Sequence, residues 1–177
     1  MTQRYEDPAH ARFFTFGCYR RKHLFLVDSL AELFIQHLDQ WRMQNAIRLL
    51  AFVVMPNHVH MLVHSDQTTL GKQLGMLKGR FGRNALPRIE ETNASLFSSL
   101  EVRDHGTMMH RFWQTGGGYD RNVFNDDAVR KMMEYIHNNP VRAGMVIVPE
   151  EYLWSSARFW LTGVSDLLEM DRLEGVL

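Results

Sequence analysis

Two apolar runs, residues 47–55 and 58–64, are separated only by Pro56 and Asn57. Both runs have the length and the content of β-branched and aromatic residues that are typical of strands. Proline followed by asparagine is a turn signal. Because so short a connection joins only antiparallel neighbours, the two runs predict a β-hairpin. Any fold proposed for this chain has to contain that hairpin.

The segments around the hairpin predict further elements. Two more strands are predicted, one over residues 12–20 and one around residues 119–124. Helices are predicted, from apolar residues that recur at intervals of three and four, over residues 28–45, 68–86 and 125–139. The last helix is expected to stop before Pro140. Residues 87–110 and the tail after residue 140 have little pattern, and the three glycines at 116–118 predict a turn or a mobile loop.

The order of these elements is strand, helix, strand, strand, helix, strand and then a final helix. This order favours an α+β fold with a ferredoxin-like or RRM-like antiparallel sheet. Two helices are then expected on one face of the sheet, followed by a separate C-terminal helix, and the other face is expected to stay open for a ligand. A length of 177 residues fits a single domain over residues 1–177.

Composition limits the cellular setting and the partners. The single cysteine, Cys18, forms no internal disulfide and belongs to no Cys-x-x-Cys zinc motif. No signal peptide and no apolar stretch of about 20 residues is present, so we expect a soluble cytoplasmic protein without membrane contact. Net charge is zero, but residues 8–27 and 67–89 contain basic residues and no acids. These segments are either two surfaces for a polyanion or ordinary solvated faces.

Three histidines interrupt the second strand of the hairpin. Because side chains alternate along a strand, Val59, Met61 and Val63 share one face, whereas the histidines His58, His60 and His64 share the other with Leu62. Two imidazoles two residues apart on one face can converge on one cation. The alternative is a pair of ordinary histidines on a half-exposed sheet, and the pair alone does not decide between them. His64 is two further steps away, and we expect it to be structural.

The final helix carries the second candidate. Its apolar stripe is formed by Val129, Met132, Met133 and Ile136. Tyr135 lies about 120° from the centre of this stripe, and Asn139 follows one turn later on nearly the same flank. A tyrosine beside an oxygen ligand can act as a nucleophile, although a boundary tyrosine facing water is the commoner case. Tyr119, after the glycine run, is a rival that we rank behind Tyr135.

Together these segments resemble a known family. "VMPNHVHMLV" is similar to the HUH motif, and "YIHNNPVRAGMV" resembles the nucleophile helix of the one-tyrosine HUH transposases. "FWQTGGGYDRNV" and "YLWSSARFW" resemble segments that flank this helix in the REP-associated tyrosine transposases, a branch of the one-tyrosine HUH single-strand transposases. The resemblance covers about residues 10–160, and the motifs occur in the family's order and spacing.

The resemblance implies a specific chemistry. His58 and His60 would bind Mg²⁺ or Mn²⁺, and Asn139 lies where the family has a polar third ligand. Mn²⁺ suits a site of two imidazoles and an amide better than Mg²⁺ does. Tyr135 would attack a DNA phosphate and form a 5′-phosphotyrosine, so the enzyme would cleave and rejoin single-stranded DNA at hairpins. Members of the family often form homodimers, so a homodimer is one expected state.

The expected DNA contacts are basic side chains near these motifs: Lys78, Arg80 and Arg83 on the second helix, Arg12, Arg20 and Arg21 near the first strand, and Arg142 after the nucleophile helix. Aromatic side chains available for stacking on bases are Phe13, Phe16, Tyr19, Phe112 and Trp113, although we expect most of them in the core. Two other functions stay open. One is a non-catalytic module that binds single-stranded nucleic acid, and the other is a replication or relaxase-type HUH nickase.

Overall fold

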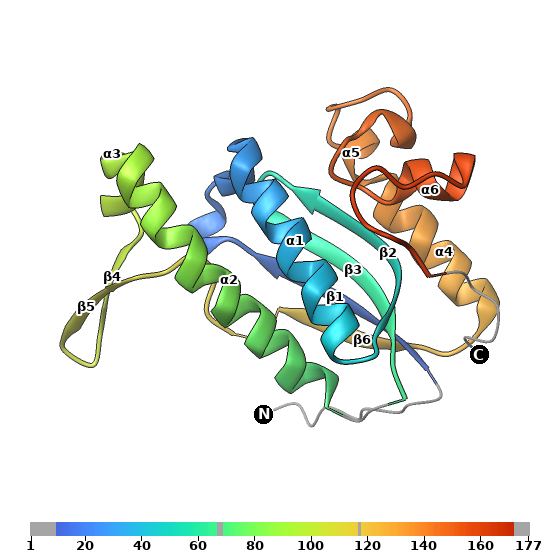
Figure 1. Ribbon diagram of the computed structural model, residues 1–177, viewed down its shortest axis with the longest axis horizontal. Coiled ribbons are helices and arrows are strands. Elements are labelled where there is room, and N and C mark those ends of the chain that lie inside the picture. Colours follow the sequence, from blue (N-terminus) through green and yellow to red (C-terminus); the bar gives the residue numbers. More distant parts are fainter. Residues whose placement is uncertain (1–9, 67–68, 117, 172–177) are drawn as a thin grey trace.

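Four strands form one antiparallel sheet in the order β2-β3-β1-β6 (Figure 1). The computed structural model describes residues 10–66, 69–116 and 118–171. The strands are β1 (Ala11–Gly17), β2 (Arg48–Met55), β3 (His58–His64) and β6 (Tyr119–Val123). Strands β2 and β3 form the expected hairpin. This strand order is that of the split β-α-β plan, so the ferredoxin-like α+β prediction is confirmed.

Helices cover both faces of the sheet (Figure 1). Helices α1 (Asp28–Gln44) and α2 (Leu70–Thr92) pack on one face over a large core that includes Phe14, Phe16 and Phe34. Helix α4 (Asp126–His137) packs on the opposite face over a second core that includes Phe13 and Leu62. The expectation that this face stays open is therefore wrong for much of its area, because the apolar stripe of α4 needs a surface to cover it.

The C-terminal segment, which has little sequence pattern, is attached to the edge of the sheet. It contains α5 (Asn139–Arg142), a 3-10 turn η3 (Pro149–Glu151) and α6 (Ala157–Thr162). The amide of Val54 donates to the carbonyl of Trp154 (2.8 Å), and the Tyr152 hydroxyl donates to the carbonyl of Val54 (2.9 Å). These bonds satisfy backbone groups of the edge strand β2, which explains how an irregular segment is held in place.

Residues 87–110 are more regular than the sequence predicts. Helix α2 continues through Pro87 to Thr92 and is followed by α3 (Ala94–Ser98) and by a hairpin of β4 (Glu101–Asp104) and β5 (Thr107–His110). The hairpin turns at His105 and Gly106, whose φ angles of 47° and 85° are those of a two-residue type I′ turn. The strands are short and mostly exposed, so they lack the apolar alternation that reveals a strand. Figure 1 shows this hairpin projecting away from the sheet.

The first strand is shorter than predicted. Strand β1 ends at Gly17, and Cys18 makes only an isolated bridge to Trp113 before a 3-10 turn over Tyr19–Arg21. The reason is the backbone of Arg20 and Arg21, which have φ angles of 51° and 56° and therefore leave the extended region.

The glycine run has a structural role at Gly118. This residue has a φ of 71°, and a Cβ atom placed on it would overlap the carbonyl oxygen of Thr15. Only glycine tolerates both the backbone conformation and the close approach. Gly118 thereby lets β6 begin directly beside β1, so that Tyr119 pairs with Thr15.

Candidate active site

A cavity of about 520 Å³ opens on the sheet face that carries α4. It is bordered by strands β1, β3 and β6, by the turn after β1, and by the end of α4. The side chains that line it are Phe13, Thr15, Arg21, His58, His60, Tyr119, Arg121, Met132, Tyr135 and Asn139. The cavity therefore brings together His58, His60, Tyr135 and Asn139, which the sequence motifs single out from positions almost 80 residues apart. No acidic side chain is among the lining residues.

The two histidines of β3 point their Nε2 atoms at each other, 3.0 Å apart. Nδ1 of His58 lies 2.6 Å from the side-chain oxygen of Asn57 and donates to it, so Nε2 of His58 presents a lone pair. Nδ1 of His60 lies 2.6 Å from the hydroxyl of Thr15. This hydroxyl either donates to or accepts from the ring, and when it accepts, both Nε2 atoms present lone pairs to the same point.

Both histidines are neutral at neutral pH. Burial lowers the pKa of His58 to about 4, with a smaller contribution from the positive charge of Arg21. Burial, with a smaller contribution from the neighbouring His58, lowers the pKa of His60 to about 3. A metal binds the deprotonated imidazole, so both rings are in the form that coordinates a cation.

Asn139 completes the donor set. Its amide nitrogen donates to the carbonyl of Tyr135 (2.6 Å), which fixes the amide orientation across the junction of α4 and α5. Its side chain also interacts with the ring of His60, and this interaction raises the pKa of His60 against the larger lowering effects. Because the amide nitrogen is bonded to the Tyr135 carbonyl, the amide oxygen is the atom available to the histidine pair.

The residues present fit a divalent cation. Two nitrogens each about 2.1 Å from one ion at a right angle are about 3.0 Å apart, which matches the separation of the two Nε2 atoms. The part of the chain that the structure describes contains no cluster of three or more His, Cys, Asp or Glu side chains. A cation at this cavity would therefore be held by His58, His60 and the amide oxygen of Asn139, a nitrogen and oxygen set that suits Mn²⁺.

Tyr135 lies at the mouth of the cavity. Its side chain is 39 % exposed, because it is off the apolar stripe of α4. Its ring meets the rings of His60 and Phe13 edge-on, with centroids 5.6 Å and 6.0 Å away. The guanidinium of Arg142 lies 5.6 Å from the ring centroid. The phenol is thus accessible to a macromolecular substrate and adjacent to the candidate metal ligands.

Tyr119, the rival nucleophile, also lines the cavity. It is more exposed than Tyr135, at 57 %, and its ring lies edge-on to Phe13 at 6.1 Å. It sits on β6, whereas Tyr135 lies on α4, one turn before Asn139 at the start of α5. The two tyrosines therefore flank Phe13 from different elements, and Tyr119 is a natural comparison for Tyr135. His64 lies outside the cavity and bonds through Nδ1 to Arg48 at 2.9 Å, as expected for a structural residue.

Arg12 is placed differently from the prediction. It is 3 % exposed, and two of its guanidinium nitrogens, Nε and one Nη, donate to the two carboxylate oxygens of Asp120 at 2.8 Å. It points to the face of the sheet covered by α1 and α2, because it alternates with Phe13. The prediction that Arg12 contacts DNA is therefore not supported: its charge is already used in a buried ion pair.

The Arg12–Asp120 pair predicts a large stability effect. Asp120→Ala leaves the guanidinium of Arg12 buried without this carboxylate, and we expect it to lower the free energy of unfolding by about 3 kcal/mol or more. Urea denaturation measures the change. Asp127→Ala, which removes the exposed pair with Lys131, is the matched control and should alter stability little. A similar effect of both variants would contradict the prediction.

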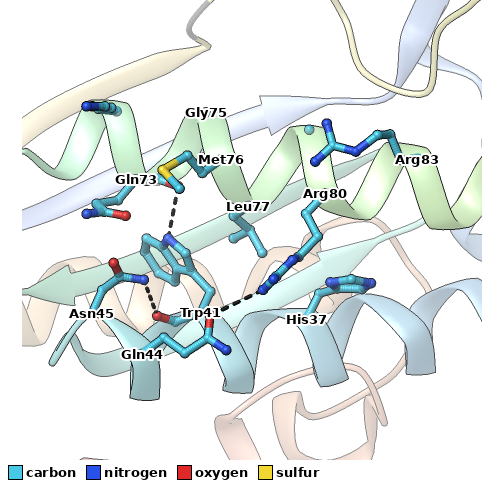
Figure 2. Close-up of a pocket in the computed structure, with 12 residues that line it drawn as sticks. His37, Trp41, Gln44, Asn45, Gln73, Gly75, Met76, Leu77, Arg80 and Arg83 are labelled. Atoms are coloured by element: carbon cyan, nitrogen blue, oxygen red, sulfur yellow. Dashed lines mark hydrogen bonds between the residues drawn. The ribbon is translucent and has the colours of Figure 1, made fainter.

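The other predicted DNA contacts lie on two different surfaces. One surface is formed by α2, which carries Lys78, Arg80 and Arg83. It lies on the sheet face covered by α1 and α2, away from the cavity described above. Figure 2 shows Arg80 reaching across to Gln44 of α1 (3.2 Å) beside a groove of about 630 Å³, with Arg83 further along the same helix. Arg142, in contrast, is beside Tyr135. Of the predicted contacts, Arg142 and Arg21 share a surface with the candidate active site, because Arg21 lines the cavity.

The stacking candidates are mostly in the core. Phe16, Tyr19, Phe112 and Trp113 are buried under α1 and α2, and Phe13 forms the floor between the two tyrosines. Thr15 and Asn57, which orient the histidine rings, were missed. The position of Asn57 directly before His58 could have indicated its role from the sequence. Thr15 can be identified only from the strand register that pairs it with His60.

Close to the site, His137 is buried and bonds through Nε2 to the hydroxyl of Ser156 (2.8 Å). Burial lowers its pKa to about 4. In the unfolded chain the imidazole of residue 137 takes up a proton near pH 6.5, whereas in the folded chain it does so only near pH 4. Protonation therefore favours unfolding, so the free energy of unfolding is unaffected above about pH 6.5 and decreases as the pH falls toward 4. We expect His137→Gln to reduce the loss of unfolding free energy between pH 7 and pH 5 by about 2 kcal/mol. Urea titrations at both pH values test this, and an unchanged pH dependence would refute it.

Comparisons with known proteins agree with this site. Residues 9–139 match the model of a protein family described as "Transposase IS200 like". A protein of Haemophilus influenzae with the curated name "Putative REP-associated tyrosine transposase" is 24 % identical over 146 residues, which cover 81 % of this chain and 77 % of that protein. The resemblance seen in the sequence motifs is thereby confirmed.

A solved structure has the same fold. It is a REP-associated tyrosine transposase bound to a REP hairpin, and it superposes with a TM-score of 0.68 over 97 % of this chain and 92 % of the other. The sequences are 17 % identical. Within the residues that the structure describes, no helix is long and apolar enough to cross a membrane.

Proposed function

This chain belongs to the family of IS200-like transposases, and we propose that it is a metal-dependent enzyme that cleaves and rejoins single-stranded DNA at hairpins. The observation that carries the proposal is the convergence of the His58 and His60 Nε2 atoms beside an exposed Tyr135 in one cavity. Hairpins of REP type are the proposed substrate class, because both relatives bear the REP-associated name and one was solved with a REP hairpin.

The residues of the cavity support a covalent reaction. The phenol oxygen of Tyr135 attacks the phosphorus of a DNA phosphodiester and loses its proton to solvent. The bond from phosphorus to the 3′ oxygen breaks, and that oxygen takes up a proton, which leaves a 5′-phosphotyrosine and a free 3′-OH. In the reverse direction, a 3′-OH attacks the phosphotyrosine and restores the strand, so no external energy source is needed.

His58, His60 and Asn139 are the proposed holders of Mn²⁺ or Mg²⁺. The cation, when bound, neutralises the charge on the phosphate and orients it for in-line attack. Asn57 and Thr15 hold the two rings in their tautomers through Nδ1, as partners of metal-binding histidines commonly do. Arg142, beside the ring of Tyr135, is the proposed DNA contact nearest the reaction. Lys78, Arg80 and Arg83 are proposed to contact DNA that passes over α2.

The proposal is tested by trapping the intermediate. The protein is incubated with Mn²⁺ and labelled hairpin oligonucleotides with single-stranded flanks, and covalent adducts are separated under denaturing conditions. Digestion and mass spectrometry then locate the nucleotide on the peptide that contains residue 135. A protein that binds these hairpins equally well with and without metal, and never forms an adduct, is instead a nucleic-acid-binding module, which is the competing function.

A further inference from the structure

Arg21, which the sequence indicated only as one of several possible DNA contacts, lies next to the candidate metal ligands. It lines the same cavity as His58, His60 and Tyr135. One of its terminal guanidinium nitrogens is 3.5 Å from the position that a Cβ atom would occupy on Gly17, and Gly17 is the cross-strand partner of His58. The guanidinium therefore lies over Gly17, the last residue of β1, beside His58, the first residue of β3.

The backbone that carries Arg21 is strained. Arg20 and Arg21 have φ angles of 51° and 56°, a left-handed conformation that is unfavourable for residues with a Cβ atom. Hydrogen bonds hold the turn: Cys18 donates to the carbonyl of Asn57 (2.8 Å), Tyr19 to that of Phe112 (2.7 Å), and Arg20 to the side chain of Gln114 (3.1 Å). Non-glycine residues in such conformations are concentrated at functional sites, where the surrounding structure imposes them.

The charge of Arg21 has no carboxylate partner among the residues that the structure describes. In the ranges 10–66, 69–116 and 118–171, no carboxylate forms an ion pair with it, and no acid lines the cavity. Its neighbours are two neutral histidines, whose pKa values are lowered by burial and, to a smaller extent, by its charge. A cation in this setting lacks only an anionic partner of suitable shape, and a guanidinium matches the paired oxygens of a phosphate.

We propose that Arg21 is a catalytic residue whose guanidinium binds the non-bridging oxygens of the phosphate that Tyr135 attacks. This proposal rests on the proposed function. Arg21 donates hydrogen bonds and transfers no proton. As the phenol oxygen bonds to phosphorus and the 3′ oxygen leaves, the non-bridging oxygens keep their negative charge beside the guanidinium. Arg121, which also lines the cavity, lies on β6 opposite Phe13 and is expected to contribute less.

The turn supplies a matched pair of variants. Arg21→Gly removes the side chain at a φ that glycine adopts freely, so the variant is expected to fold at least as well as the wild type. Arg20→Gly makes the same change one residue earlier. The Arg20 guanidinium lies 5.1 Å from the ring centroid of Tyr19 and does not line the cavity. A difference in DNA binding between the two variants therefore results from the position of the lost charge and not from the change of a turn residue to glycine.

The first measurement is DNA affinity, which does not require cleavage. Binding of a labelled single-stranded dT oligonucleotide is measured with Mn²⁺ over a range of salt concentrations, with Tyr135→Phe in every protein. Arg21→Gly is expected to weaken binding about tenfold. It should also reduce the slope of log K against log salt by about 0.7, the value for one phosphate contact on a single strand, whereas Arg20→Gly should not. Equal slopes for Arg21→Gly and its parent, or equal losses in both variants, would overturn the proposal.

The second measurement is cleavage of a hairpin oligonucleotide whose scissile phosphate, mapped with the wild type, is replaced by an uncharged methylphosphonate. With the normal phosphate, Arg21→Gly should cleave roughly 100-fold more slowly than the wild type. With the methylphosphonate, the difference should fall below about tenfold, because the charge that Arg21 neutralises is gone. An equal penalty on both substrates would overturn the catalytic assignment. If no protein forms an adduct while Arg21→Gly still lowers the salt slope, the phosphate contact stands and strand transfer is the part that fails.

Discussion

Replacing Tyr135 with phenylalanine is expected to lower the rate of DNA strand cleavage by at least about 10⁴-fold and to abolish the covalent adduct. The substitution removes only the hydroxyl. The ring contacts with Phe13 and His60 persist, and α4 remains packed through its apolar stripe. Affinity for hairpin DNA should therefore stay within about twofold of the wild type. Single-turnover cleavage and equilibrium binding, measured on the same oligonucleotide, separate these two effects.

Tyr119→Phe is the matched control for this experiment. Both tyrosines line the cavity and meet Phe13 edge-on, yet only Tyr135 lies one turn before Asn139 and accepts a hydrogen bond from its amide. We expect Tyr119→Phe to keep the adduct and to cleave at a rate within about tenfold of the wild type. An adduct that survives in Tyr135→Phe and disappears in Tyr119→Phe would transfer the nucleophile to β6 and would refute the present assignment.

His58→Ala is expected to have the second largest effect. It removes one of the two converging Nε2 donors, so Mn²⁺ affinity should fall by about 100-fold or more and cleavage at limiting Mn²⁺ should fall with it. His58 is only half-buried, which makes it a safer target than the buried His60, whose ring packs in parallel against Phe13. Calorimetry or the electron paramagnetic resonance of Mn²⁺ measures binding directly, with one ion expected per chain.

Two further variants interpret that result. Asn57→Ala removes the acceptor that orients the His58 ring but leaves both donors, and we expect it to weaken Mn²⁺ binding by about 10-fold to 100-fold. His64→Ala removes a histidine on the same strand and face that bonds to Arg48, outside the cavity. It should alter stability and leave Mn²⁺ affinity unchanged. Equal losses of affinity in His58→Ala and His64→Ala would show that the metal does not bind at the cavity.

The periodic elements were predictable from the sequence because their patterns are strong. The β2–β3 hairpin, helix α1 and strand β6 lie within about two residues of the predicted ranges. Elements whose stability depends on packing were not predictable. Helix α2 passes through Pro87, and the tail is held by bonds to the edge of β2, which no local pattern indicates.

The site shows the same division. Alternation along β3 and the helical position of Tyr135 separate these residues from the core, so His58, His60, Tyr135 and Asn139 could be selected from the sequence and the family motifs. From the sequence, the histidine face is expected to stay open to solvent, whereas His60 is 5 % exposed beneath α4. Arg12 is likewise expected to be a free cation, because the register that brings Asp120 beside it is not visible in either strand alone.

The sequence by itself determined which residues carry the chemistry and on which local element each one lies, since periods of 2 and 3.6 are properties of a single segment. The tertiary structure decided which charges remain available. Arg12 and Arg21 are both arginines near the first strand, yet one is neutralised by Asp120 and the other faces the histidine pair without a carboxylate among the described residues. The reason is physical: ionisation, burial and the accessibility of a charge depend on neighbours that are brought together only when distant strands pair.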